Sequence, residues 1–193
     1  MDYIESTLKG YLDDLSARKH VPGGGSAAAL VASTAAALNL MVINYTIKPD
    51  RANDADKKFE DYRDKQETLR SDLMILVDED CRAFSSLMDT LSGGDNPEEK
   101  YITSANVPME ICRKVRDSLE ITELMLEGAN MNLVTDIGCA VQMFKAAFNS
   151  AKLNVEINLK YIKDSSYVSR SGEELASIAS GIEKTSCSVL DKI

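Results

Sequence analysis

The sequence has no tryptophan, a single histidine, four prolines and few aromatic residues. Aromatic residues make up 6% of the 193 residues, and alanine and leucine are plentiful, so the composition favours packed helices over a β-sandwich. Because the single histidine is His20, a histidine-based metal site or a catalytic triad is disfavoured. Basic side chains are also scarce: 22 Lys and Arg against 31 Asp and Glu give a net charge of −9, which argues against binding to nucleic acid or to anionic membrane surfaces.

The four cysteines are far apart in the chain and form no C-x-x-C pair. They are Cys81, Cys112, Cys139 and Cys187. This spacing indicates neither a zinc site nor a disulfide framework, and we expect no metal. Each cysteine falls in a stretch with a helical pattern, where a buried reduced thiol is the ordinary interpretation.

A targeting segment is not expected from the sequence. The first five residues, Met1 to Glu5, are acidic and lack the apolar region of a signal peptide. The uncharged stretch from Ser26 to Ile47 is long enough to span a membrane, but it is rich in alanine, contains Asn39 and Asn44, and has no aromatic belt. We therefore expect a buried helix of a cytoplasmic protein that has no membrane partner.

Apolar residues recur at three- and four-residue spacing along most of the chain and predict about six helices. We expect residues 1–193 to form one domain, an all-α bundle with the alanine-rich helix at its centre. The expected helices are a first one with Ile4, Leu8, Leu12 and Leu15; a second from Ser26 to Lys48-Pro49; a third from about Asn53 to Gly93-Gly94; a fourth from Pro97 to near Gly128; a fifth from Thr135-Asp136 to about Ile162; and a last one with Leu175, Ile178, Ile182 and Val189.

Short polar motifs predict where several of these helices begin. Ser26 is the expected N-cap of the alanine-rich helix, and Asn53 is that of the long third helix. Ser171 and Glu174 have the spacing of a capping box before the last helix. Pro108 predicts a kink in the fourth helix.

Asp80 lies where the helical period of the third helix requires an apolar residue. Leu76 and Phe84 lie four residues to either side of it, and Leu73 and Leu87 lie seven residues away. A carboxylate on a buried face is costly unless it has a partner or a function. Two interpretations follow: Asp80 is a catalytic group, or it pairs with an Arg or Lys from a neighbouring helix.

The fifth predicted helix repeats this anomaly. Asp136 shares a stripe with Ala140 and Phe144, and Asn154 and Asn158 continue the same stripe. Asp136 is either a second functional carboxylate or the N-cap of the helix. The asparagines are more often hydrogen-bond partners between helices than ligands of a substrate.

A run of glycines precedes the alanine-rich helix. Pro22, Gly23, Gly24, Gly25 and Ser26 combine backbone freedom with the exposed N–H groups of a helix start. Such a segment suits an anionic or carbonyl-bearing ligand, although it also suits a tight turn. The uncharged, small-residue helix that follows allows close helix approach, inside one subunit or between two.

These motifs together resemble the formiminotransferase-cyclodeaminase C-terminal (cyclodeaminase/cyclohydrolase) family. Four blocks in the family's order carry the resemblance: the P-G-G-G-S segment at 22–26, D-E-D-C-R-A-F at 78–84, Val107-Pro108, and the pair N-M-N-L-V-T-D-I-G at 130–138 with A-K-L-N-V-E-I-N at 151–158. The sequence departs from the family at Lys19-His20-Val21, where T-P-x is usual, at Ala129 and at Thr135. Taken alone, His20 is interpreted as a loop residue without a catalytic role, but the departure at Lys19 and His20 is expected to bear on substrate contacts at the entry to the glycine loop.

The resemblance implies an all-helical homodimer that acts on a tetrahydrofolate carrying a one-carbon group, with no cofactor beyond that substrate. It implies catalytic roles for Asp80 and Asp136. The substrate-binding residues that it implies are Pro22, Gly23, Gly24, Gly25, Ser26, Phe84, Asn130, Thr135, Asn154 and Asn158.

Two related reactions fit the expected carboxylates. The first is cyclodeamination of 5-formiminotetrahydrofolate to 5,10-methenyltetrahydrofolate and ammonia; the alternative is hydrolysis of the methenyl bridge by a cyclohydrolase. In both, a carboxylate can stabilise a cationic amidinium and move a proton. A third hypothesis is a helical module that binds folate or another protein without catalysis.

Overall fold

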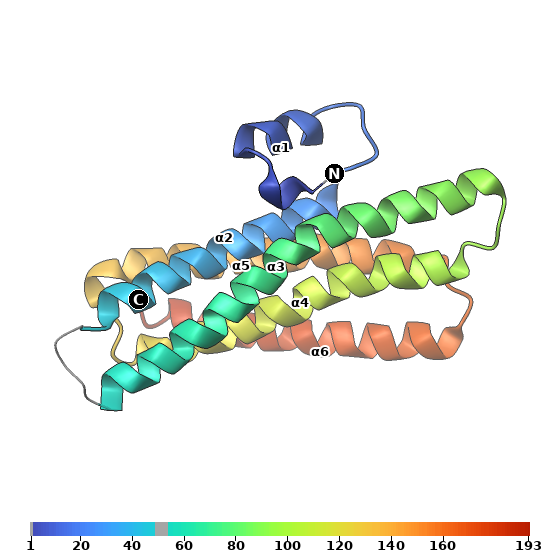
Figure 1. Cartoon of the computed structure of the whole chain (residues 1–193). Helices are drawn as coiled ribbons and strands as arrows, with labels where there is room; N and C mark the ends of the chain where they lie inside the picture. The colour runs from blue at the N-terminus through green and yellow to red at the C-terminus, as the bar shows by residue number, and fades with distance from the viewer. Residues whose placement is uncertain (1, 49–53) are drawn as a thin grey trace.

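The computed structural model describes residues 2–48 and 54–193, and within these ranges it contains helices and no strand (Figure 1). The predicted all-α fold is thereby confirmed. In chain order the elements are the 3₁₀ turn η1 (Tyr3–Glu5), α1 (Leu8–Leu15), α2 (Gly24–Thr46), α3 (Asp54–Gly93), α4 (Glu98–Leu126), the 3₁₀ turn η2 (Met131–Leu133), α5 (Val134–Leu159) and α6 (Ser165–Leu190). Two predicted boundary residues, Pro49 and Asn53, lie outside the described residues.

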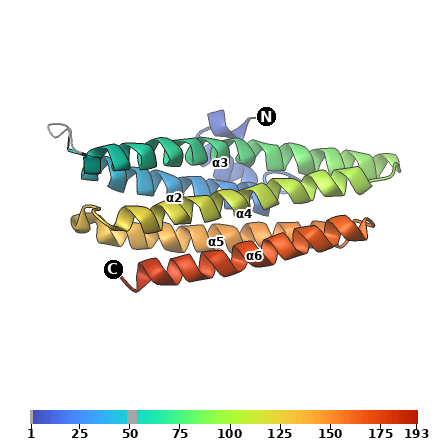
Figure 2. The ribbon, with the colours of Figure 1, turned by 90° about the horizontal axis from the view of Figure 1, so that it is seen from below.

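Five long helices, α2 to α6, run side by side and form the bundle (Figure 2). Helix α2 packs against α3 and α5, and α4 packs against the same two helices. Helix α6 lies at the edge of the bundle against α4 and α5, whereas the short helix α1 stands outside it, next to α2 and α3 (Figure 1).

Small side chains allow α2 to approach its neighbours closely. Ala28, Ala29, Ala32, Ala35 and Ala36 are all almost completely buried. By length and composition α2 could cross a membrane, but 61% of its apolar window is buried among the other helices. Much of the apolar surface of α2 is therefore buried against the other helices.

One face of α2 remains open. The exposed residues Thr34, Ala37 and Tyr45 recur at helical spacing along it, and 68% of Tyr45 is exposed. The neighbouring helix α5 exposes Ala146 and Leu153, the latter by 66%. A shallow groove runs between these two helices and has no charged residue in its lining.

Two predicted starts were wrong, each because a different group stabilises the helix end. Helix α2 begins at Gly24, and the backbone N–H of Ser26 donates to Asp80 of α3 instead of to a local cap. Helix α6 begins at Ser165, where the carboxylate of Asp164 accepts from two backbone N–H groups, so that Ser171 lies inside the helix. The first segment is divided into η1 and α1, because Thr7 caps a separate helix.

The apolar stripe predicted for the first segment was wrong at Leu8 and Leu12, whereas Ile4 and Leu15 are partly buried against the core. Leu8 and Leu12 are 67% and 50% exposed, and the buried residues of this segment are Tyr3 and Tyr11. The rings of the two tyrosines meet edge to face with 5.5 Å between their centroids. Aromatic packing, with the hydroxyl groups hydrogen-bonded, therefore holds this segment on the bundle.

The predicted helix ends agree better with the structure. Gly94 and Gly128 follow α3 and α4 with φ of 77° and 100°, a left-handed conformation that favours glycine. Helix α4 continues through Pro108. Asn39 forms the expected bond between helices, because its side-chain amide donates to Thr122 of α4 over 2.6 Å.

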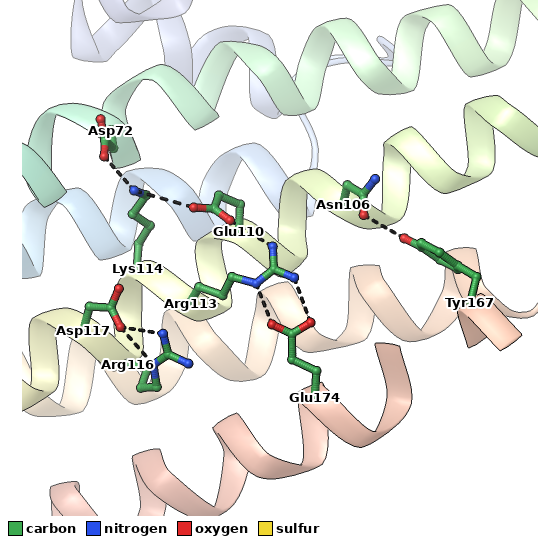
Figure 3. A network of polar contacts seen from close by, with 9 residues as sticks. All are labelled: Asp72, Asn106, Glu110, Arg113, Lys114, Arg116, Asp117, Tyr167 and Glu174. Carbon is green, nitrogen blue, oxygen red and sulfur yellow. Dashed lines mark hydrogen bonds and ion pairs between the residues drawn. The ribbon is translucent and has the colours of Figure 1, made fainter. Parts of the chain in front are cut away.

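A network of ion pairs connects α3, α4 and α6 on the outside of the bundle (Figure 3). The guanidinium of Arg113 donates two bonds to Glu174 of α6, at 2.7 and 2.8 Å, and one to Glu110. Lys114 reaches Asp72 of α3 over 2.6 Å. These side chains are partly solvated, and ion pairs of this kind add little to stability. We therefore infer that the network orients α6 more than it stabilises the fold.

Candidate functional site

A cavity of about 370 Å³ opens at the end of the bundle where α2 begins. Four segments meet there: the loop before α2, the second half of α3, the start of α4 and the end of α5. Asp80 and the glycines Gly23, Gly24 and Gly25 line the cavity, together with apolar side chains such as Phe84. Together with Asn154 and Asn158, seven of the sequence-predicted site residues therefore line one cavity.

Asp80 is placed against the start of α2. Its Oδ2 atom accepts a hydrogen bond from the backbone N–H of Ser26 over 2.8 Å. Among the described residues, the ion pairs do not include Asp80, so the predicted alternative of an Arg or Lys partner is not found there. Burial raises the pKa of the Asp80 carboxyl to about 6, and the bond from Ser26 opposes this rise.

Two asparagines of α5 complete the inner wall. Asn154 and Asn158 line the cavity, and Asn154 lies beside Gly24. The Asn158 amide donates to the backbone oxygen of Ser104 in α4 over 2.9 Å and to that of Asn154 over 2.8 Å. Because its N–H groups are bound to backbone, the amide oxygen of Asn158 remains available as an acceptor.

Aromatic side chains form the outer part of the cavity. Tyr101 and Tyr161 are stacked with a centroid separation of 4.9 Å and an interplanar angle of 14°. Phe84, which is 38% exposed, and Ile157 lie in the same lining. Such a surface suits a flat, conjugated ring system.

The N-terminal segment holds the loop that precedes α2. The backbone N–H of Tyr3 donates to Oδ1 of Asp78 in α3 over 2.6 Å, and its hydroxyl group donates to Asp14 over 3.1 Å and to the backbone oxygen of Val21 over 3.3 Å. Tyr11 and Ser26 share a buried hydroxyl–hydroxyl bond of 3.1 Å. Burial is the main cause that raises the pKa of Tyr3 to about 12. Asp78 and Asp80, two residues apart on α3, thus fix the two sides of the loop.

Pro22 and Ser26 are buried beneath the loop and do not line the cavity. Their predicted role in substrate binding is therefore indirect: Ser26 supplies the N–H group that Asp80 accepts.

Three predicted site residues lie at the other end of the bundle. Asn130 donates its backbone N–H to Thr46 at the end of α2, and Thr135 and Asp136 follow in the first turn of α5. The 21 residues between Gly25 and Thr46 correspond to about 30 Å of helix. Within one chain, the structure therefore does not bring these residues to Asp80.

Asp136 is not the N-cap of α5 either. The N-cap position is Leu133, which makes no side-chain cap bond, and Asp136 lies inside the first turn. Its carboxylate is only partly buried.

Three polar residues of the cavity were not predicted from the sequence: Tyr101, Ser104 and Tyr161. A signal for them exists in the sequence, because all three lie near the helix ends that an antiparallel bundle brings together with Gly25. His20, interpreted above as a loop residue without a catalytic role, lines the same cavity as Asp80.

Within residues 2–48 and 54–193, no three His, Cys, Asp or Glu side chains come together as a candidate metal site. What the cavity offers is a desolvated carboxylate, amide groups and aromatic surface. A carboxylate in such a place can stabilise a flat cation and exchange a proton with it.

Comparison with known proteins identifies similar chains. A family model described as formiminotransferase-cyclodeaminase matches residues 7–177. A methenyltetrahydrofolate cyclohydrolase from Methylorubrum extorquens is 31% identical over 180 residues, which cover 88% of this chain and 86% of that protein. A formimidoyltransferase-cyclodeaminase from Gallus gallus is 26% identical over 97% of this chain, which spans 37% of the length of that protein. The crystal structure of a formiminotetrahydrofolate cyclodeaminase from Thermotoga maritima is similar to this chain, with a TM-score of 0.91 and 31% identity. The matched region covers 96% of this chain and 94% of that chain.

Proposed function

Because the chain belongs to the formiminotransferase-cyclodeaminase family, we propose that it is an enzyme acting on the one-carbon group between N5 and N10 of tetrahydrofolate. The first candidate reaction is cyclodeamination of 5-formiminotetrahydrofolate. The observation that carries the proposal is Asp80, a desolvated carboxylate without a cationic partner among the described residues, in a cavity with aromatic walls. The missing counter-charge is what a cationic substrate supplies.

The reaction asks little of the protein beyond charge and proton transfer. N10 attacks the amidine carbon on N5, and a tetrahedral carbon bonded to three nitrogens forms. N10 loses its proton, the former amidine nitrogen gains one, and the C–N bond breaks with its electron pair leaving on ammonia. The product is the 5,10-methenyl cation. In this scheme Asp80 stabilises the cations and accepts the proton from N10.

Hydrolysis of the methenyl bridge is the second candidate. The cyclohydrolase from Methylorubrum extorquens supports it, with 31% identity over most of both chains. In this reaction water attacks the methenyl carbon and loses a proton, which gives a hydroxyl group on a tetrahedral carbon. The hydroxyl proton is then lost as the C=O bond of the formyl group forms, and the bond to one nitrogen breaks, with the electron pair and one proton going to that nitrogen. The same carboxylate serves both reactions, so the site geometry favours neither.

An absorbance assay with both substrates separates these candidates. Formation of the methenyl chromophore from 5-formiminotetrahydrofolate identifies a cyclodeaminase, whereas decay of that chromophore faster than its uncatalysed hydrolysis identifies a cyclohydrolase. Neither signal, together with tight folate binding in calorimetry, would instead favour a binding module and overturn the enzymatic proposal.

We further propose that the active form is a homodimer joined through the open face of α2 and α5. The uncharged small residues Thr34, Ala37 and Ala146 are exposed there beside Leu153 and Tyr45. A dimer with a twofold axis perpendicular to the helices has an isologous interface. In such a dimer the start of α2 lies beside the end of the partner's α2. The segment from Asn130 to Asp136 lies at that end. The dimer thus offers a second set of polar groups next to Asp80.

Subunit mixing tests the shared site. Asp80→Asn and Asp136→Asn proteins are each expected to be weakly active, and their random mixture is expected to recover roughly a quarter of the parent activity, because half of the dimers regain one intact site. If both carboxylates act within one chain, mixing recovers nothing.

The interface itself is tested by Ala37→Arg on α2, which is expected to give a monomer with little activity in light scattering and enzyme assays. Ser180→Arg, on an exposed position of α6, is the matched control and is expected to remain an active dimer. A parent protein that is monomeric at micromolar concentration would contradict this part of the proposal. We also propose that no cofactor beyond tetrahydrofolate takes part, so activity should persist after dialysis against a chelator.

A further inference from the structure

His20 has an unusual position for an exposed loop residue. It lies in the loop before α2, is solvent-exposed, and lines the cavity that contains Asp80. It is the single histidine of the chain. Imidazole both donates and accepts protons, and it is the side chain that enzymes use most often as a general acid or base.

The backbone on both sides of His20 is held by the same small group of residues. On one side the ammonium group of Lys19 forms an ion pair with Asp14, whose side chain is only 19% exposed. On the other side the backbone oxygen of Val21 accepts from the hydroxyl of Tyr3, which also donates to Asp14. Tyr3 is in turn fixed to α3 by Asp78. The loop is therefore tied to the bundle, and His20 is presented at a defined place in the cavity lining.

The cavity brings few titratable groups toward His20. Asp80 comes from α3, Tyr101 from α4 and Tyr161 from α5, while Lys19 and Asp14 neutralise one another beside it. Carboxylates and imidazoles are the general acids and bases that enzymes use most often, so Asp80 and His20 are the two groups of this lining suited to proton transfer.

We propose that His20 is the proton donor to the departing nitrogen, while Asp80 takes the proton that the attacking group loses; this inference rests on the proposed function. In cyclodeamination, imidazolium gives its proton to the amino group of the tetrahedral carbon as the C–N bond breaks, and ammonia leaves with the electron pair. The N10 proton passes to Asp80. Each turnover ends with neutral imidazole and protonated carboxyl, and solvent restores both.

The positions of the two groups fit these roles. Asp80 lies deep, against the start of α2, where a negative charge stabilises the cationic carbon. His20 lies at the exposed side, where a small hydrophilic product can leave for water. In the cyclohydrolase reaction the departing nitrogen belongs to the folate, and the same donor serves it.

The kinetic test uses His20→Gln with Arg18→Gln as the matched control, since Arg18 is an exposed residue of the same loop outside the cavity lining. His20→Gln is expected to lower kcat by about 10²–10⁴, whereas Arg18→Gln keeps the parent kcat. A His20→Gln enzyme with kcat within threefold of the parent would overturn the donor role. An inactive parent enzyme would instead overturn the proposed function.

A second measurement does not depend on turnover. Because the chain has one histidine, NMR of the protein with labelled histidine shows a single imidazole. We expect 5-formyltetrahydrofolate, which has no amino group to lose, to shift this resonance. If the probe binds in calorimetry and the resonance stays unchanged, His20 does not face the substrate and the inference is wrong.

Discussion

The carboxylate of Asp80 occupies the space that a Cβ atom on Gly25 would need. The two residues come from different helices, and the carboxylate accepts a hydrogen bond from the backbone N–H of Ser26, the residue after Gly25. Glycine at position 25 is therefore required by close approach, because its backbone φ is not in the left-handed region. The glycine run and the partly buried Asp80, separate motifs in the sequence, are two halves of one contact.

Gly25→Ala is expected to displace Asp80 and to lower both activity and stability. Alanine normally favours a helix by about 1 kcal/mol over glycine, so a loss of about 1–3 kcal/mol in the free energy of unfolding would measure the overlap with the carboxylate. Gly172→Ala in α6, where no atom lies within 4 Å of the new methyl group, is the control and is expected to be neutral or stabilising. Chemical denaturation measures the free energy of unfolding of both variants. Equal values for the two would contradict the contact between Gly25 and Asp80.

Asp80→Asn is expected to reduce kcat by about 10²–10⁴ while the fold remains intact. The pKa of about 6 means that the wild-type carboxyl is ionised at pH 8 and loses its charge as the pH falls through 6. The acid limb of the wild-type pH profile should therefore have its midpoint near 6 and disappear in the variant. Steady-state rates from pH 5 to 9 test this, and an unchanged acid limb would assign it to another group.

Although Asp80→Asn is expected to lower kcat, it is expected to raise the stability of the folded protein at high pH. The pKa of Asp80 rises from 3.8 to about 6 on folding, so the folded state favours the protonated form. Its contribution to stability is fully present below pH 3.8 and is lost as the pH rises to about 6. Relative to wild type, Asp80→Asn should thus be similar near pH 4 and more stable at pH 8, by at most about 3 kcal/mol. Thermal unfolding at both pH values is the measurement; a less stable variant at pH 8 would indicate a cation bound to Asp80.

Asp78→Ala is expected to release the N-terminal segment from α3. The carboxylate of Asp78 is 2% exposed and accepts from the backbone N–H groups of Tyr3 and Ile4. Its loss leaves these groups unpaired, at a cost of about 1–3 kcal/mol, and should speed hydrogen exchange at both amides. Glu79→Ala, one residue away and exposed, is the control and is expected to leave exchange unchanged. Equal exchange in the two variants would mean that aromatic packing alone holds the segment.

The helical period was sufficient to predict the bundle and to identify Asp80. Periodicity depends on neighbours within two turns, and Asp80 interrupts a stripe that is otherwise apolar. It could not show that Asp80 stabilises the start of α2, because that bond joins residues 54 positions apart. For the same reason Ser26 was predicted to cap its own helix.

The site was predicted less completely than the fold. Motifs were grouped by their residue types, whereas the distance between them depends on which end of the bundle each helix end reaches. Asn130 and Asp136 lie beside the end of α2, and Asn154 and Asn158 lie beside its start, although all four belong to one segment of the chain. Antiparallel packing of α2 and α5 separates them, and the order of motifs along the chain carries no information on this.

The connection from Tyr3 through Asp78 to α3 also has a practical consequence for handling the protein. Residues fused directly before Tyr3 would pull on the segment that holds the loop of His20, so an affinity tag at this end could lower the measured rate without unfolding the bundle. At the other end, Lys192 and Ile193 contact Glu123 and Gly138, and Gly138 lies two residues from Asp136. A tag after Ile193 would thus lie beside the segment that the proposed dimer uses, so a cleavable tag is the safer choice for kinetic work at either end, and removing it from the first residues should restore turnover.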